Sequence, residues 1–235
     1  VGSLLLSSLH NAQASFSSPK QSLLLEQQPI HYHVIKPATK ASSQIVMLLG
    51  GGPGFSSWNL ELIQQKIAAM GHTTLLMDMA SIGENAHIQP NNVLKTWVKQ
   101  IHAVLGEVTD NNHSITLIGH SWGALMAMLY QRTYPDNIDK IILLNPVDPE
   151  KKSMQNLTAE IDQRNRQEQQ IQWDSDDAWE QKTDISINEL EAITLKQITQ
   201  VLPTYFMDYQ KGLEYAQKFT IEDFDMDLNI QTWKE

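Results

Sequence analysis

Cysteine is absent from this chain of 235 residues, which excludes disulfide bonds, thiolate catalysis and cysteine-ligated metals. Positive charge is scarce, because 17 Lys and Arg stand against 27 Asp and Glu and the formal net charge is −10. This balance argues against nucleic acid as a main partner. Hydrophobic residues make up 41% of the chain, which is typical of a globular protein. We therefore expect a folded domain. No metal and no cofactor are predicted for it.

No histidine follows residue 120. The eight histidines are His10, His31, His33, His72, His87, His102, His113 and His120. This absence matters because Ser121 lies in Gly119-His120-Ser121-Trp122-Gly123, which has the G-x-S-x-G pattern of a nucleophile elbow. Where this elbow is catalytic, an acid and then a histidine base follow the serine along the chain. The sequence therefore predicts a serine nucleophile whose base is missing from the expected place.

The residues around the serine favour a true elbow over a chance match. Residues 115–118 are predicted to form a buried strand, and residues 124–134 a helix. A tight strand-to-helix turn strains and exposes the serine, and the helix N-terminus favours the negative charge of acyl transfer. We predict that the Trp122 N–H donates to this oxyanion. His120, next to the serine in sequence, is predicted to be a packed residue and not the base.

Strands and helices alternate through the first part of the chain. Strands are predicted at 30–35, 44–49, 73–77, 115–118 and 140–144, and helices at 56–70, 92–105 and 124–134. This alternation predicts an α/β fold with a mostly parallel sheet flanked by helices. The first helix is expected to begin with a Ser56 or Ser57 cap. Its predicted core face consists of Leu60, Ile63, Ile67 and Met70.

The composition changes near residue 150. The next fifty residues are rich in Gln, Asn, Asp and Glu and contain no glycine. Helices are predicted at 156–171, 187–202 and 204–218. We interpret this stretch as a helical cap inserted over the active site. The expected domains are a core at 15–147, the cap at 148–230, and a truncated return to the core at 231–235.

Residues 1–14 are predicted to be the remnant of a signal peptide. Leu4-Leu5-Leu6-Ser7-Ser8-Leu9 and then Ala12-Gln13-Ala14 follow the order of an apolar h-region and an A-x-A cleavage site. The run is too short to span a bilayer, so no stable membrane insertion is expected. A frayed or partly buried terminal segment is the alternative. A signal peptide implies a secreted or periplasmic protein, which N-terminal sequencing of the exported chain tests.

Gly50-Gly51-Gly52-Pro53-Gly54 follows a predicted strand and allows a backbone N–H to approach a substrate. With the elbow, this run makes the chain similar to α/β-hydrolases, most of all to the proline iminopeptidase-like group of serine peptidases and esterases. That group has H-G-G-P-G here, so glycine replaces its histidine. The resemblance implies that Gly52 is the second oxyanion donor. The group's Asp-x-Arg-Gly-x-Gly-x-Ser corresponds to Asp78–Asn85, in which only Asp78 and Gly83 match.

Acidic and aromatic side chains supply the remaining candidates. Some relatives place the catalytic acid after the strand that follows the elbow helix, where this chain has Asp148; the alternative is a turn aspartate. Three later acids are predicted to be solvated: Asp223, Asp225 and Asp227. The candidate pocket residues of the cap are Trp173, Trp179, Tyr205 and Phe206, and packing against the core is the alternative.

Two functions follow from these residues. The first is a serine hydrolase that cleaves a peptide, amide or ester bond of a small-molecule or peptide substrate through Ser121. It would be inactive as this chain stands, because the base is missing. The second is a hydrolase-like protein that binds a small molecule without turning it over. A fluorophosphonate probe distinguishes them, because only an activated serine is labelled.

Overall fold

The computed structural model describes residues 16–38, 42–110, 112–148, 150–169, 186–232 and 234. These residues form two compact units. One contains the described residues up to 150 together with those from 222 onward, and the other contains those from 151 to 221. The predicted signal segment at 1–14 and the predicted pocket residues Trp173 and Trp179 lie outside the described residues.

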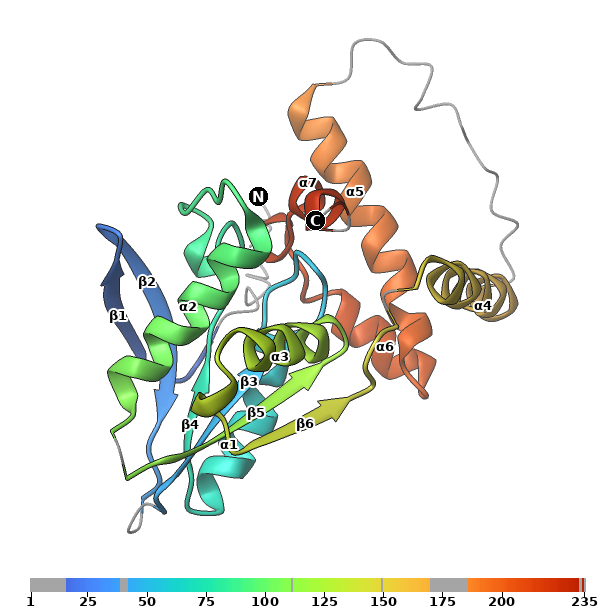
Figure 1. The fold of residues 1–235 in the computed structure, drawn as a ribbon. Coiled ribbons are helices and arrows are strands. Elements are labelled where there is room, and N and C mark those ends of the chain that lie inside the picture. Colours follow the sequence, from blue (N-terminus) through green and yellow to red (C-terminus); the bar gives the residue numbers. More distant parts are fainter. Residues whose placement is uncertain are drawn as a thin grey trace, which may run out of the picture. The chain divides into compact units, whose positions relative to one another are not determined.

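The larger unit is built on a six-stranded sheet (Figure 1). Its strands are β1 (Lys20–Leu25), β2 (Gln28–Ile35), β3 (Gln44–Leu49), β4 (Thr73–Leu76), β5 (Ser114–His120) and β6 (Lys140–Leu144). Their order is β1-β2-β4-β3-β5-β6. Strands β4, β3, β5 and β6 are mutually parallel, and β1 and β2 are antiparallel to their neighbours. The prediction of a mostly parallel sheet is therefore confirmed.

Strand β1 was not predicted from the sequence, because two signals are missing there. Its side chains are mostly exposed, and Leu24 is 75% exposed, so the apolar residues do not mark a buried face. The turn into β2 places Glu26 and Gln27 at φ 50° and 70°. Turns of this kind are normally marked by Asn-Gly or a similar pair, and this pair carries no such mark.

Helices cover both faces of the sheet. They are α1 (Glu61–Ala69), preceded by a short 3-10 helix at Trp58–Leu60, α2 (Val93–Val108) and α3 (Trp122–Thr133). Ile45, Met47 and Leu49 of β3 pack in one core with α2 and α3, and Val46 and Leu48 pack in a second core with α1. Figure 1 shows α1 on the opposite side of the sheet from α2 and α3. A fully apolar strand is thus buried on both faces, as its sequence indicates.

The start and the inner face of α1 differ from the prediction. Neither serine provides a side-chain cap; the Ser56 hydroxyl donates to Asp78 instead. Met70 is 74% exposed, so its predicted core position is wrong. The fully buried positions of the helix are Gln64 and Ala68. The predicted helical periodicity extends to Met70, but the helix ends one residue earlier, at Ala69.

The second unit consists of helices among its described residues. They are α4 (Lys151–Gln169), α5 (Ile187–Val201) with a 3-10 turn at Leu202–Tyr205, and α6 (Tyr209–Ala216). Ser186 and Glu189 form a capping box at the start of α5. Gly212 of α6 lies so close to Pro203 that a Cβ there would stand 2.6 Å from the Pro203 Cα. Helix α7 (Met226–Thr232) belongs to the larger unit. None of the helices in the described ranges is long and apolar enough to cross a membrane.

Candidate active site

Ser121 occupies a strained turn between β5 and α3. Its φ is 54° and its ψ is −118°, a conformation that a residue with a Cβ rarely adopts. The turn is fixed by the Ser121 N–H, which donates to the Leu144 carbonyl of β6 at 2.9 Å, and by the Ser121 carbonyl, which accepts from Ala124 N at 3.0 Å. Two backbone bonds therefore hold the serine at the carboxyl end of the parallel strands. This is the geometry of a nucleophile elbow.

The two glycines of the elbow are required by close backbone contacts. A Cβ at Gly119 would lie 2.5 Å from the Ala124 Cα, so only glycine lets α3 approach β5 this closely. A Cβ at Gly123 would lie 2.5 Å from the Gly50 carbonyl oxygen. The second glycine thus allows the start of α3 to lie against the glycine-rich loop that follows β3.

That loop packs directly on the turn that contains Ser121. A Cβ at Gly51 would lie 3.3 Å from both the Ser121 Cβ and the His120 Nδ1. Gly52 has a φ of 139°, and its peptide bond to Pro53 is cis. Gly52 and Trp122, the predicted oxyanion donors, thus belong to two segments that meet beside Ser121. Their role as donors stays a prediction.

Asp78 ties the end of this loop to the segment after β4. Its Oδ1 accepts from the Ser56 hydroxyl at 2.9 Å and from Ser57 N at 2.7 Å, and its Oδ2 accepts from Glu84 N at 3.2 Å. Asp78 is 2% exposed. Burial raises the pKa of its carboxyl from 3.8 to about 6, while the donated hydrogen bonds act in the opposite direction. One buried carboxylate therefore positions the loop that faces the serine.

Gly83 makes room for this carboxylate. Its φ is 47°, and a Cβ at this position would overlap the Asp78 Oδ2. Asp78 and Gly83 are the two positions that match the stretch shared with the proline iminopeptidase-like group. The sequence therefore pointed to this pair, but only the structure reveals its contact with the Ser56–Ser57 turn.

A segment near the C-terminus also holds the loop. Asp225 N donates to the Gly54 carbonyl at 2.8 Å, and Asn229 Nδ2 donates to the Pro53 carbonyl at 2.6 Å. The Asp223 carboxylate accepts from Trp58 Nε1 at 3.0 Å. Asp223 is 5% exposed, so the prediction that it is solvated is wrong. Its partner lies 165 positions away in the sequence, and no local pattern announces such a contact.

The other two acids of this stretch differ from each other. The Asp225 carboxylate accepts from Leu228 N at 2.9 Å and caps α7, so it is not simply solvated. Asp227 is exposed, as predicted. Three similar aspartates thus have three different environments.

No histidine in the described part of the chain is hydrogen-bonded to the Ser121 hydroxyl. Six of them have other partners: His31 with Ser22, His33 with Ser18 and Glu84, His72 with Ser42, His87 with Pro29, His102 with Tyr130, and His113 with Asp110. The seventh, His120, has a buried Nδ1 without a partner and lies against Gly51. Burial lowers the pKa of His120, which favours the neutral ring.

The remaining candidates stay predictions. Asp148 is exposed, and its Oδ1 accepts from Glu150 N at 2.9 Å, which is the geometry of a turn aspartate. In the other unit, Tyr205 is 61% exposed and the Phe206 ring packs at 4.9 Å from Tyr215. Within the part of the chain that the structure describes, no group of three His, Asp or Glu side chains would suit a metal ion.

The geometry and the sequence comparison identify the class of protein. The model of the alpha/beta hydrolase fold family matches residues 44–192, more than half of the chain, and the chain belongs to this family. Among curated proteins it resembles the proline iminopeptidase of Lactobacillus helveticus, with 29% identity over 102 residues, 42% of this chain and 34% of that protein. The proline iminopeptidase of Clostridioides difficile is 28% identical over 149 residues, 57% of this chain and 47% of that protein.

A solved structure agrees at the level of the fold. The proline iminopeptidase of Mycobacterium smegmatis superposes with a TM-score of 0.55 at 14% identity, over 92% of this chain and 69% of that one. The chain spans between about a third and a half of the length of the two curated relatives. The family and the fold are therefore established, and the reaction is inferred separately below.

Proposed function

We propose that this α/β-hydrolase is a serine hydrolase that cleaves a peptide, amide or ester bond through an acyl-enzyme at Ser121. The observation that carries the proposal is the strained turn of Ser121, with φ 54°, against the glycine-rich loop. A turn of this kind holds a serine hydroxyl at the surface beside backbone N–H groups. Strain maintained by the surrounding structure is most common at functional sites.

In the proposed reaction, the Ser121 Oγ bonds to the substrate carbonyl carbon and gives its proton to a general base. The carbonyl oxygen becomes an oxyanion, which the N–H groups of Gly52 and Trp122 would stabilise. Collapse of this intermediate breaks the bond to the amine or alcohol, which leaves with the proton. Water then hydrolyses the ester at Ser121 and regenerates the hydroxyl.

The base is the missing part of this scheme. Six of the described histidines contact residues other than Ser121, and His120 lies against Gly51. We therefore expect this chain alone to turn over substrate poorly, because a serine that is activated only by its turn and by the N-terminus of α3 is a weak nucleophile. The named activity of the curated relatives favours a peptide substrate with an N-terminal proline.

A fluorophosphonate probe tests the proposal directly. We expect slow but measurable labelling of the wild-type chain and none of Ser121→Ala. Ser114→Ala is the matched control, because Ser114 lies at the opposite end of the same strand. Its labelling should equal that of the wild type.

Two results would change the proposal. No labelling of a folded wild-type chain would favour a protein that binds a small molecule without turning it over. Rapid hydrolysis of a proline anilide, abolished by Ser121→Ala, would instead show that a base is present in this chain.

A further inference from the structure

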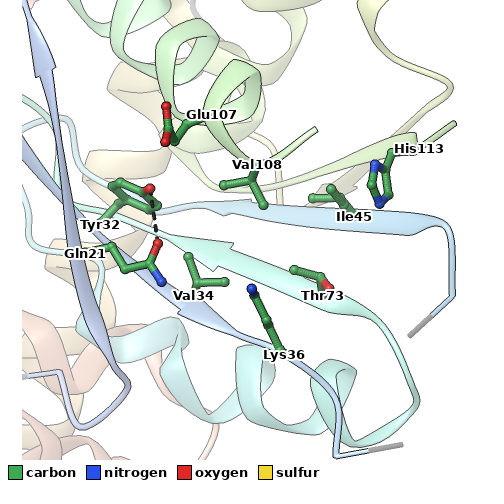
Figure 2. Close-up of a pocket in the computed structure, with 9 residues that line it drawn as sticks. All are labelled: Gln21, Tyr32, Val34, Lys36, Ile45, Thr73, Glu107, Val108 and His113. Carbon is green, nitrogen blue, oxygen red and sulfur yellow. Dashed lines mark hydrogen bonds between the residues drawn. The ribbon is translucent and has the colours of Figure 1, made fainter. Parts of the chain in front are cut away.

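A pocket of about 380 Å³ lies in the larger unit (Figure 2). The strand register places it at the opposite end of the sheet from Ser121. It includes Ile45 and Thr73 at the amino ends of β3 and β4. Ile45 pairs with Ile115 of β5, which precedes Ser121 by six residues. At about 3.3 Å per residue, the two sites are separated by about 20 Å along the strand. The pocket is therefore distinct from the candidate active site.

Two opposite charges line this pocket without forming an ion pair with each other. They are Glu107, in the last turn of α2, and Lys36, just after β2. Both side chains are exposed, and neither forms an ion pair or a side-chain hydrogen bond with any residue that the structure describes. Both are therefore available to groups of a ligand.

The environment of Glu107 favours a cation. Helix α2 has no basic residue in its last turn, so the negative end of its dipole is not compensated there. The carboxylate of Glu107 adds to this negative potential. Nearby, the Tyr32 hydroxyl donates to Gln21 Oε1 at 3.3 Å, and burial together with the Glu107 charge raises the pKa of Tyr32. The phenol thus stays neutral, and Glu107 is the negatively charged group that would contact a cationic group of a ligand.

Two valines contribute to the apolar part of the pocket lining. Figure 2 shows Glu107, Tyr32 and Gln21 toward one end and His113 toward the other, with Val34 and Val108 between them. The Lys36 side chain extends along the lower wall toward Val34. A ligand that satisfies these groups carries an ammonium group, a carboxylate and an aliphatic part.

We propose that this pocket binds a small zwitterion, with an ammonium group at Glu107, a carboxylate at Lys36 and an aliphatic segment against Val34 and Val108. Short peptides and free aliphatic amino acids share this chemistry. A volume of about 380 Å³ lies within the usual range of small-ligand pockets. The site does not depend on the reaction proposed for Ser121.

Isothermal titration calorimetry tests this site with L-alanyl-L-leucine and with L-leucine as probes. The full chain carries Ser121→Ala, so that the peptide is not hydrolysed. We expect saturable binding of at least one probe, which also identifies the source of the zwitterion. N-acetyl-alanyl-leucine, which lacks the ammonium group, and alanyl-leucine amide, which lacks the carboxylate, should each bind about tenfold more weakly than the dipeptide if the dipeptide binds.

Two variants locate the binding in the pocket. Glu107→Gln and Lys36→Met should each weaken the binding of the better probe about tenfold. Lys66→Met and Glu214→Gln are matched controls on exposed helix positions and should leave it unchanged. Both pocket residues are exposed, so folding should persist, and circular dichroism verifies this. Absence of binding by both probes, or binding that both pocket variants leave unchanged, would overturn the proposal.

Discussion

At the scale of single residues, local pattern says least about the buried contacts that hold the glycine-rich loop and the turn after it. Asp78 is a buried carboxylate held by Ser56, Ser57 and Glu84, and its ordinary sequence context gives no hint of this burial. Ser121 was predictable because its motif encodes a backbone geometry. Asp223 was not, because its environment is created by Trp58, far away in the sequence. The motif thus identifies the candidate nucleophile, and burial identifies the residues that hold the segments around it.

The pH dependence of stability tests the assignment of Asp78. Its pKa is about 6 in the folded chain against an ordinary value of 3.8, so the folded chain binds more protons between these values. The free energy of unfolding should therefore fall as pH rises from about 4 to about 6.5, by about 3 kcal/mol from this group alone. Asp78→Asn removes this contribution, and urea denaturation across that range measures the difference.

Asp227→Asn is the control for this experiment, because Asp227 is exposed. It should keep the pH profile of the wild type. If wild type instead gains stability over Asp78→Asn as pH rises, the hydrogen bonds to the carboxylate outweigh its burial. The stated cause of the raised pKa would then be wrong.

At the scale of secondary-structure elements, strongly periodic or continuous apolar segments were predictable. Strands β3 and β5 are buried on both faces, and their sequences are correspondingly apolar. The helix expected at 92–105 is found at Val93–Val108, with Asn92 capping it through a 2.8 Å bond to Lys95 N. Strand β1 was missed because its side chains are mostly exposed and its turn lacks the usual residues. The sequence indicated close contact between elements only where a glycine allows two backbones to approach, as at Gly119 and Gly123.

The packing of α3 on β5 gives a second prediction. Gly119→Ala places a Cβ 2.5 Å from the Ala124 backbone, which cannot move without disturbing the elbow. We expect this variant to lose about 1–3 kcal/mol of unfolding free energy. Gly106→Ala, in the exposed interior of α2, has no atom within 4 Å of its new Cβ. It should gain about 0.5–1 kcal/mol, because alanine favours a helix over glycine.

Chemical denaturation of both variants separates packing from propensity. A small or absent loss in Gly119→Ala would mean that α3 can withdraw from β5. The close approach would then not be needed for folding. Fluorophosphonate labelling of the same variant would show whether Ser121 still depends on that approach.

At the scale of the whole molecule, the family and the class of fold were predictable, and the arrangement was not. The alternation of strands and helices indicates a parallel sheet, but the order β1-β2-β4-β3-β5-β6 depends on pairings between distant segments. The position of α7 was not predictable either. Asn229 of α7 and Asp225 just before it donate hydrogen bonds to the glycine-rich loop, which is far away in the sequence. Within the candidate site, the sequence predicted the serine and both glycine motifs. Only the structure shows the contacts that hold them in place.

The edge of the sheet gives the last prediction. Within the described chain, β6 pairs with β5 and with no other strand, while its Ile142 and Leu143 are 38% and 40% exposed. An apolar edge with unpaired backbone groups favours association between copies. We expect the purified protein to associate with rising concentration, and Leu143→Lys to shift that association to at least severalfold higher concentration, because an edge lysine disfavours strand pairing.

Sedimentation velocity at several concentrations measures this effect. Leu62→Lys is the matched control, because Leu62 is 62% exposed on α1, away from any strand edge. It adds the same charge and removes the same apolar side chain. If both variants reduce association equally, net charge or general hydrophobicity controls it, and the edge of β6 does not. If only Leu143→Lys acts, pairing along β6 is the cause.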